Sequence, residues 1–319
     1  LAIDGRNTTS STTIGNQIYL NSSSSLVNRT IHTIRSEIPF GVYYVDNCPR
    51  HTKKITLTCL DGMAKFDTVY SSSGLFTSAN VATHLSQLCS KILGSEKLYP
   101  TSGFVNYLTS IFPNVATLNV TLPPPDGKIT HRDVLIYLLQ LLGGYAFMDW
   151  NGQLRIVKFN SDVDSTNSNY NKVSTSDRYS SDIDENSVSV TGVSVFYKTT
   201  ENDSDVERNV LVGTSGYVIE IVGNPLITEA NASTVANAIY NNVFGSSFTM
   251  IPFSISTKPY PNLYPLDRIL IYTNNDYLHT AKYSYISNVN FKLNGAMSLS
   301  GKAETTTDKG YASINAFTA

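Results

Sequence analysis

The hydrophobic pattern of the chain changes between a period of two residues and a helical period, and this restricts the folds that it can adopt. Most apolar runs are short, β-branched or Tyr-rich, and bounded by polar turns, as strands are. Ile55, Leu57 and Cys59 alternate with Thr residues, which is typical of a half-buried strand. In the first hundred residues the pattern predicts strands at residues 14–20, 30–34, 41–46 and 53–59.

Two segments show one apolar stripe at helical spacing. In residues 81–92 the stripe includes Cys89, which we interpret as a small core residue, and Gly94 follows as a C-cap. A helix is also predicted at residues 228–244, with Gly245 after it. Its apolar face is formed by Val235, Ile239 and Val243.

A further helix has the clearest start and end signals. Thr130 with Asp133 three residues later resembles a capping box, and a Leu-rich body follows to residue 142. The Gly143-Gly144 pair then ends the helix. Residues 134–148, which include most of this helix, form the longest apolar stretch of the chain. Gln140 and the two glycines interrupt it, and it is too short to span a bilayer.

Two Asn-Gly pairs predict hairpins. Asn151-Gly152 separates the apolar runs 145–149 and 154–159, so residues 95–160 are expected to form a small α/β unit with a helix on a hairpin. Asn294-Gly295 predicts a second hairpin near the end. The later strands are expected at residues 188–199, 217–222, 269–273, 283–287, 289–293 and 296–303.

Residues 160–186 are predicted to be a long polar loop, either functional or a flexible linker. Asp162 and Asp164 have the spacing that opens a calcium loop, but the required Gly and distal Glu are missing, so a solvated turn is expected. The overall order is therefore β, α/β, β, α, β. A β region that is split around a helical insertion implies a barrel closed by strands distant in sequence.

Composition excludes several classes of protein. Charged residues make up 15% of the chain, against about 25% in an average domain. The net charge of −2 gives neither a basic nucleic-acid footprint nor a polybasic membrane signal. The chain begins at Leu1 without a basic segment followed by an apolar run, so no signal peptide is predicted. The 20 Tyr residues and the low charge favour a protein held in a larger assembly.

No catalytic motif is present. The chain has no Gly-x-Ser-x-Gly, no His-Glu-x-x-His and no glycine-rich phosphate loop. His131 is expected in the first turn of its helix, neutral and facing solvent, and the acidic residues of 177–185 are expected to be solvated. A bridge between Cys48 and Cys59 on adjacent strands stays open. The five scattered histidines form no recognisable site: His32, His51, His84, His131 and His279.

Several segments resemble the tail-hub proteins of long-tailed phages and prophages. In that family a strand ends in an Asp-x-Met-x-Lys-Phe/Leu-Asp stretch, as it does here from Asp61 to Asp67. Residues 130–156 resemble the family's helix, Gly-Gly break and Asn/Asp-Gly hairpin. Residues 213–226 and 291–302 complete the order, so the resemblance covers about residues 40–305.

The resemblance implies a trimeric baseplate hub. Each protomer of that family carries two tube-like β-barrels, so three copies form a pseudo-sixfold ring that matches the tail tube. The ring joins the tube to a distal tail protein, spike or lysin, and DNA leaves through its channel without specific binding. The resemblance thus implies a homotrimer in the virion tail, assembled in the bacterial host cytoplasm. No membrane insertion is expected, and the lack of a catalytic motif predicts no enzymatic activity.

The expected fold class is mainly β with α+β insertions: two antiparallel β-barrels plus smaller α/β domains. No catalytic, cofactor-binding or metal-binding residue is predicted, and no cofactor. An alternative function is a β-rich carbohydrate-binding or adhesin component of a tail, and a cell-wall hydrolase is a more distant one. The expected domains are a first barrel (1–80), an α/β domain (81–160), the polar loop (161–186), the first part of a second barrel (187–227), a helix-containing insertion (228–262) and the remainder of that barrel (263–319).

Overall fold

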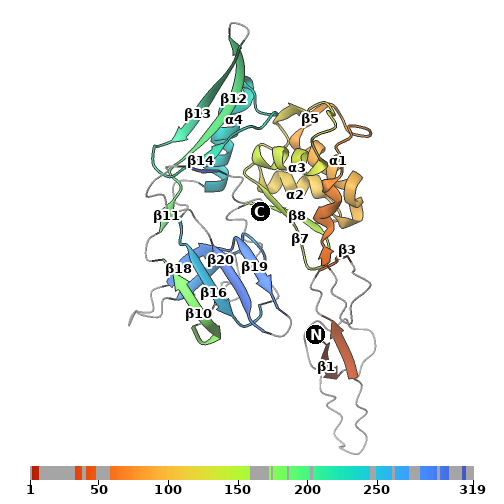
Figure 1. Ribbon diagram of the computed structural model, residues 1–319, viewed down its shortest axis with the longest axis vertical. Coiled ribbons are helices and arrows are strands. Elements are labelled where there is room, and N and C mark those ends of the chain that lie inside the picture. The colour runs from red at the N-terminus through yellow and green to blue at the C-terminus, as the bar shows by residue number, and fades with distance from the viewer. Residues whose placement is uncertain are drawn as a thin grey trace, which may run out of the picture.

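The computed structural model shows a mixed α/β fold with more strand than helix (Figure 1). No helix among the residues it describes is long and apolar enough to span a bilayer. The described elements form three units and three further strand pairs, two of which are N-terminal. The structure describes residues 2–6, 33–37, 41–47, 58–158, 172–173, 175–184, 187–201, 204–244, 249–260, 263–272, 281–292, 295–301 and 311–313.

The α/β unit, residues 61–158, contains three α-helices and two short antiparallel strand pairs. Its helices are amphipathic and turn Leu-rich faces into a shared core; Leu85, Leu108 and Leu138 have no exposed surface. Its elements are η2 (Gly62–Asp67), β5 (Ser78–Asn80), α1 (Val81–Leu93), η3 (Ser95–Lys97), α2 (Phe104–Ile111), β6 (Asn119–Thr121), α3 (His131–Gln140), β7 (Tyr145–Met148) and β8 (Leu154–Val157).

The sheet–helix unit is a four-stranded sheet with the strand order β13-β12-β14-β21, and α4 packs on it. β12 and β13 form a long antiparallel hairpin, whereas β14 and β21 join in parallel. Val193 and Val195 of β12 are buried with Val235 and Ile239 of α4. The elements are β12 (Gly192–Glu201), β13 (Ser204–Gly213), β14 (Val218–Ile221), α4 (Glu229–Ile239), a π-helical turn (Tyr240–Phe244) and β21 (Tyr311–Ser313).

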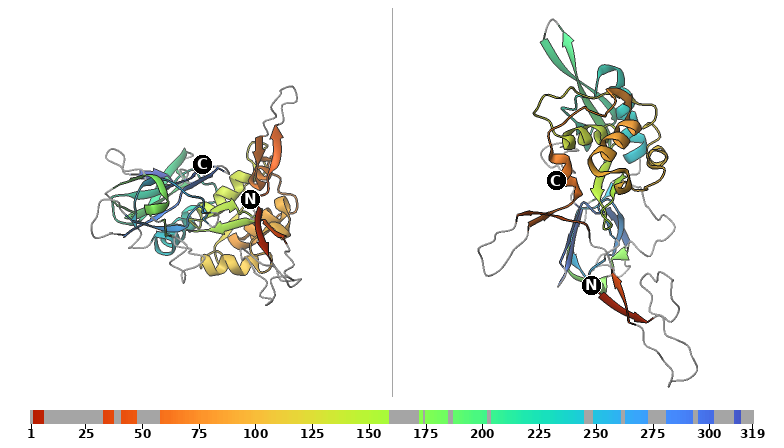
Figure 2. Two further views of the ribbon diagram at one scale, coloured as in Figure 1. Left: turned by 90° about the horizontal axis from the view of Figure 1, so that it is seen from below. Right: turned by 90° about the vertical axis from the view of Figure 1, so that its right-hand side faces the viewer.

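The two-sheet unit consists of a four-stranded sheet (β10-β16-β20-β19) and a three-stranded sheet (β18-β17-β9) around a separate core (Figure 2). Both sheets contribute buried side chains, such as Ile255 and Ile271. The elements are β9 (Lys172–Val173), η4 (Thr175–Asp177), β10 (Arg178–Ile183), β16 (Phe253–Thr257), β17 (Arg268–Tyr272), β18 (Ala281–Tyr285), β19 (Asn288–Phe291) and β20 (Met297–Gly301).

Shorter strand pairs complete the described elements. One pair lies along the chain between the two β-rich units, and the two others belong to the N-terminal part, where β3 leads toward the α/β unit (Figure 1). These pairs are β11 (Val188–Ser189) with β15 (Thr249–Met250), β1 (Ala2–Arg6) with β2 (Thr33–Glu37), and β3 (Tyr44–Asn47) with β4 (Thr58–Leu60).

The α/β unit and the sheet–helix unit share one core. Asn224 donates to the carbonyl of Tyr137 at 2.9 Å and to Oε1 of Gln140 at 3.0 Å. It therefore links the segment that follows β14 to α3. Gly143, at φ +62°, lets α3 end close to α4 and its π-helical turn, because a Cβ there would lie 3.1 Å from Cγ2 of Ile239 and 2.9 Å from Cγ2 of Val243.

The strongest local signals are confirmed. Helices α1, α3 and α4 form where predicted, and Gly94 donates its N–H to Ser90 O as a C-cap. The Thr130–Asp133 capping box is present. The β7–β8 and β19–β20 hairpins form around the two Asn-Gly pairs, and β12, β14, β17 and β18 occupy predicted strands.

The predicted polar loop of residues 161–186 is wrong in its second half. Residues 178–183 form strand β10, which pairs with β16. Its side chains are largely polar because it is an edge strand with much of its surface exposed, so no apolar alternation marks it. Helix α2 and strands β13 and β16 were also not predicted.

The two predicted barrels stay a prediction. Among the described residues the sheets have two to four strands, and none closes on itself. Strands β12 and β14 lie in one sheet, and β16, β19 and β20 lie in another. The predicted strand at 14–20, the Asp162–Asp164 turn, Cys48, and His32, His51 and His279 lie outside the described residues.

Candidate functional site

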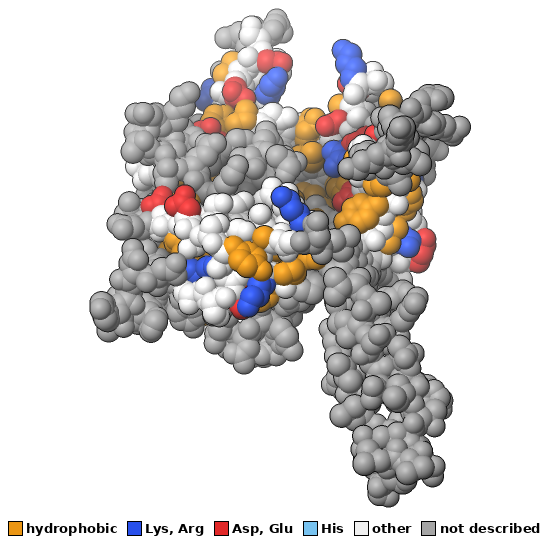
Figure 3. Space-filling model, turned by 60° about the horizontal axis from the view of Figure 1, so that its bottom comes forward, with side chains coloured by type: hydrophobic (Ala, Val, Ile, Leu, Met, Phe, Trp, Pro, Cys, Tyr) orange, Lys and Arg blue, Asp and Glu red, His pale blue; other side chains and the backbone are white. Residues whose placement is uncertain are grey.

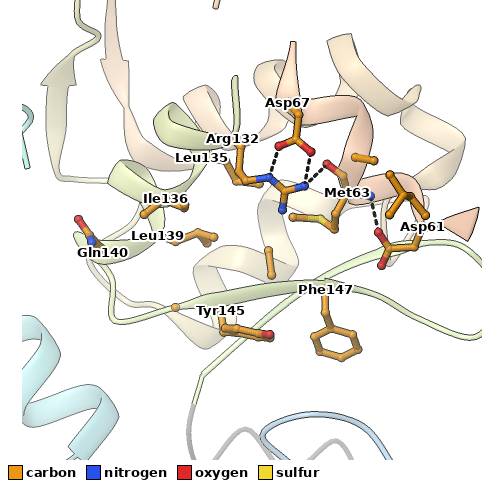
Figure 4. A pocket seen from close by; sticks show the side chains of 14 residues that line it. Asp61, Met63, Asp67, Arg132, Leu135, Ile136, Leu139, Gln140, Tyr145 and Phe147 are labelled. Carbon is orange, nitrogen blue, oxygen red and sulfur yellow. Dashed lines mark hydrogen bonds and ion pairs between the residues drawn. The ribbon is translucent and has the colours of Figure 1, made fainter. Parts of the chain in front are cut away.

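A groove lies between η2, α3 and β7 of the α/β unit, with a volume of about 300 Å³ (Figure 4). The chain enters η2 through Asp61, whose Oδ1 accepts the N–H of Met63 at 2.9 Å and so caps the short helix. Phe66 has no exposed surface and anchors η2 in the main core. The groove's lining is mostly apolar: Leu60, Met63, Ala64, Leu135, Ile136, Leu139, Gly144, Tyr145, Ala146 and Phe147, with Asp61, Asp67, Arg132 and Gln140.

An ion pair closes one rim of the groove. Arg132, in the first turn of α3, contacts Asp67 through Nε and donates from Nη2 to Asp67 Oδ2 at 2.9 Å. The same Nη2 donates to the carbonyl of Met63 at 2.8 Å. Hydrogen bonding from Arg132 lowers the pKa of the Asp67 carboxyl, and the same contact raises the pKa of Arg132. The pair therefore links the surface of η2 to α3.

A second charged cluster holds the turn between β7 and β8. Asp149 is buried and forms an ion pair with Arg155 Nε at 2.9 Å. Its Oδ1 accepts the N–H groups of Asn151 and Gln153, each at 2.9 Å. The Arg155 guanidinium lies 3.8 Å from the ring centroid of Tyr99. Because every partner is internal, we interpret this cluster as structural.

His131 does not face solvent, so that prediction is wrong. It is 4% exposed, and its Nε2 accepts the N–H of Ser71 at 3.3 Å while Nδ1 lies 3.1 Å from the carbonyl of Thr68. The segment from Thr68 to Ser71, which follows η2, covers this face of α3. The helical period of α3 alone does not reveal that contact. The ring also makes an edge contact with Tyr70.

The other titratable residues singled out from the sequence lie apart from the groove. Cys89 is buried in the main core as predicted, and burial raises the pKa of its thiol. Asp177 contacts Lys258 Nζ at 2.8 Å and Tyr260 OH at 2.7 Å, which lowers the pKa of its carboxyl. Within the described ranges no cluster of three His, Cys, Asp or Glu side chains could hold a metal.

The groove itself was not predicted as a site. Asp61, Met63 and Asp67 belong to the first segment that resembles tail-hub proteins, and Arg132 belongs to the second. The resemblance of both segments to one family was the only signal in the sequence that pointed to these groove residues. The contact between Asp67 and Arg132 joins residues 65 positions apart, and local patterns carry no such information.

The fold is similar to those of three solved tail proteins. The first is the 43 kDa tail protein of prophage MuSo2 from Shewanella oneidensis, with 12% identity over 81% of this chain and 76% of that chain and a TM-score of 0.44. The second is prophage tail protein gp18 from Listeria monocytogenes, with 14% identity over 84% of this chain and 79% of that chain and a TM-score of 0.45. The third is a tail protein from Neisseria meningitidis, with 9% identity over 85% of this chain and 82% of that chain and a TM-score of 0.42. Likeness at this level concerns the arrangement of elements and is no evidence of activity. No protein-family model matches the chain, and no curated protein matches its sequence.

Proposed function

We propose that this chain is a structural, non-enzymatic hub or tail-tip adaptor of a phage or prophage tail. Three copies form a ring that joins the tail tube to a distal tail protein, spike or lysin. The ring surrounds the channel through which DNA leaves, and the chain itself neither binds DNA specifically nor inserts into a membrane. Its location is the virion tail.

One observation carries the proposal: the two segments that most resemble tail-hub proteins fold together as a single unit. Arg132 of the second segment binds both Asp67 and the Met63 carbonyl of the first. Phe66 of the first segment and Leu135 and Leu138 of the second are buried in the same core. A chance match of two separate short motifs gives no reason for such mutual packing.

The surface is consistent with a component of an assembly. Hydrophobic side chains form patches on the face seen in Figure 3, with charged side chains scattered between them. Exposed apolar side chains concentrate around β3 and β4, where Val45 is 59% exposed. Such residues are typical of surfaces that bind other proteins. They comprise Val42, Tyr43, Tyr44, Val45 and Leu60.

Light scattering on a size-exclusion column, with negative-stain averaging of the same peak, tests the proposal. We expect a mass three times that of the 35.0 kDa protomer and a threefold ring with a central channel. Where the free chain is monomeric, the same measurement is repeated with purified tail tubes. Failure to form a ring in both experiments, or a measurable affinity for bacterial glycans in a monomer, would overturn the hub and favour the adhesin.

A further inference from the structure

Strand β7 has one edge in the groove. It pairs with β8 along its other edge, and among the described residues no further strand joins this two-stranded sheet. The residues from Gly144 to Phe147 line the groove consecutively. Side chains of consecutive strand residues point to opposite faces of a sheet. A groove that all four consecutive residues line therefore borders the edge of the strand. Alternate residues of an edge strand direct their backbone N–H and C=O groups outward.

Both faces of β7 are already covered. Met148 contacts η2, because a Cβ on Gly62 would lie 2.8 Å from its Cε. Phe147 packs on the ring of Tyr264 at a centroid distance of 5.5 Å. Figure 4 shows Tyr145 and Phe147 projecting from the same side of the strand. The edge, and not a face, is therefore what β7 offers to a ligand.

The walls of the groove combine apolar surface with one carboxylate, that of Asp61, which makes no ion pair among the described residues. Met63 and Ala64 of η2 and Ile136 of α3 are half-buried. The charge of Asp67 is balanced by Arg132. Asp61 accepts the Met63 N–H. A ligand with a positive charge near Asp61 therefore complements the groove.

We propose that the groove binds an extended peptide segment that adds a strand to the free edge of β7. An apolar side chain of this segment enters between η2 and α3, and a Lys or Arg lies beside Asp61. Main-chain hydrogen bonds then supply affinity and the side-chain positions supply specificity. The assignment of the segment to a neighbouring tail protein rests on the proposed function; strand addition itself does not.

Selection of random displayed peptides on the full chain tests the proposal. Ala64→Leu, which fills the groove, and Ile136→Glu, which places a charge in it, are screened in parallel after thermal unfolding shows that both fold. We expect the wild type alone to enrich peptides with apolar residues at every second position and a Lys or Arg. Equal enrichment on either folded variant would overturn the proposal.

A synthetic copy of one enriched peptide then tests strand pairing by fluorescence anisotropy. N-methylation of alternate backbone amides is expected to weaken binding at least about tenfold, since each blocks a hydrogen bond to β7, whereas methylation of the intervening amides changes little. Equal effects at all positions would exclude strand addition. Asp61→Asn keeps the cap acceptor and is expected to raise Kd by about two- to fivefold. Asp205→Asn on exposed β13 is the matched control, with no expected change.

Peptide binding and ring formation fail independently. A ring that does not bind the peptides would leave the proposed function and overturn the strand-addition site. Peptide binding by a chain that never forms a ring would overturn the proposed function and leave the strand-addition site. Enriched peptides that match this chain's own sequence would overturn the neighbouring tail protein as donor in favour of a second copy.

Discussion

The two hydrophobic cores of the molecule differ in how they are closed. The main core runs through the α/β and sheet–helix units and tolerates buried polar groups, because His84, Asp149 and Asn224 all have internal partners. The smaller core lies between two sheets and is bordered by hydroxyls, with Thr257 donating to Asp177 O and Ser284 to Ile251 O. The groove lies on the main core, whereas the edge strands β10 and β19 of the two-sheet unit are partly exposed.

The largest effect is expected from Asp149→Ala. The substitution leaves Arg155, whose side chain is 12% exposed, without its ionic partner, and it also removes the acceptor for two backbone N–H groups of the turn. We expect a loss of about 3–5 kcal/mol in the free energy of unfolding, measured by urea denaturation. Asp149→Asn, which retains an acceptor oxygen, is the milder control. A loss below about 1 kcal/mol for Asp149→Ala would show that the turn does not depend on this pair.

Truncation within each core tests whether the cores unfold separately. Ile271→Ala is expected to cost about 2–5 kcal/mol and to raise amide exchange in β16, β17 and β20 while α1 and α3 stay protected. Leu138→Ala in the main core is the matched variant and should expose α1 and α3 instead. Hydrogen-exchange mass spectrometry distinguishes these outcomes. Equal deprotection of all units by Ile271→Ala would show one cooperative molecule.

Elements with complete local signals were predictable from the sequence. Helix α3 has its capping box at Thr130 and its Gly143-Gly144 end, and the β7–β8 hairpin contains Asn151-Gly152. Both signals lie within a few residues of the structure that they specify. Helix α2 has only eight residues and no side-chain cap, so its apolar pattern was too short to distinguish.

The groove was not predictable in the same way, because it depends on non-local contacts. Asp67 and Arg132 are distant in sequence, and the edge of β7 is available only because no strand joins it among the described residues. Strand β10 illustrates the same limit: its polar sequence indicates a loop, and backbone pairing with β16 makes it a strand. His131 was misplaced because burial depends on Thr68 and Ser71 covering it.

An intermediate effect is expected from acidification, through His84. It is 1% exposed, with Nε2 3.1 Å from the carbonyl of Val120, and burial lowers its pKa below 6.5. The unfolded chain therefore binds a proton first, and stability falls as the pH drops below about 6.5, by up to about 1.4 kcal/mol per pH unit. Urea midpoints at about pH 7.5 and about pH 5 should differ less in His84→Gln than in the wild type. An equal difference between the two urea midpoints in both proteins would show that titratable groups other than His84 cause the pH dependence.

The smallest effect is expected from Asp67→Asn, and it sharpens the comparison with Asp149. The Asp67 side chain is 54% exposed, so solvent screens its pair with Arg132, and we expect a loss below about 1 kcal/mol that shrinks further in high salt. Urea denaturation at low and high ionic strength measures both values. Because Arg132 also holds the Met63 carbonyl, η2 should stay in place and peptide binding in the groove should persist. A loss as large as that of Asp149→Ala would mean that the rim pair, and not the core beneath it, fixes η2 against α3.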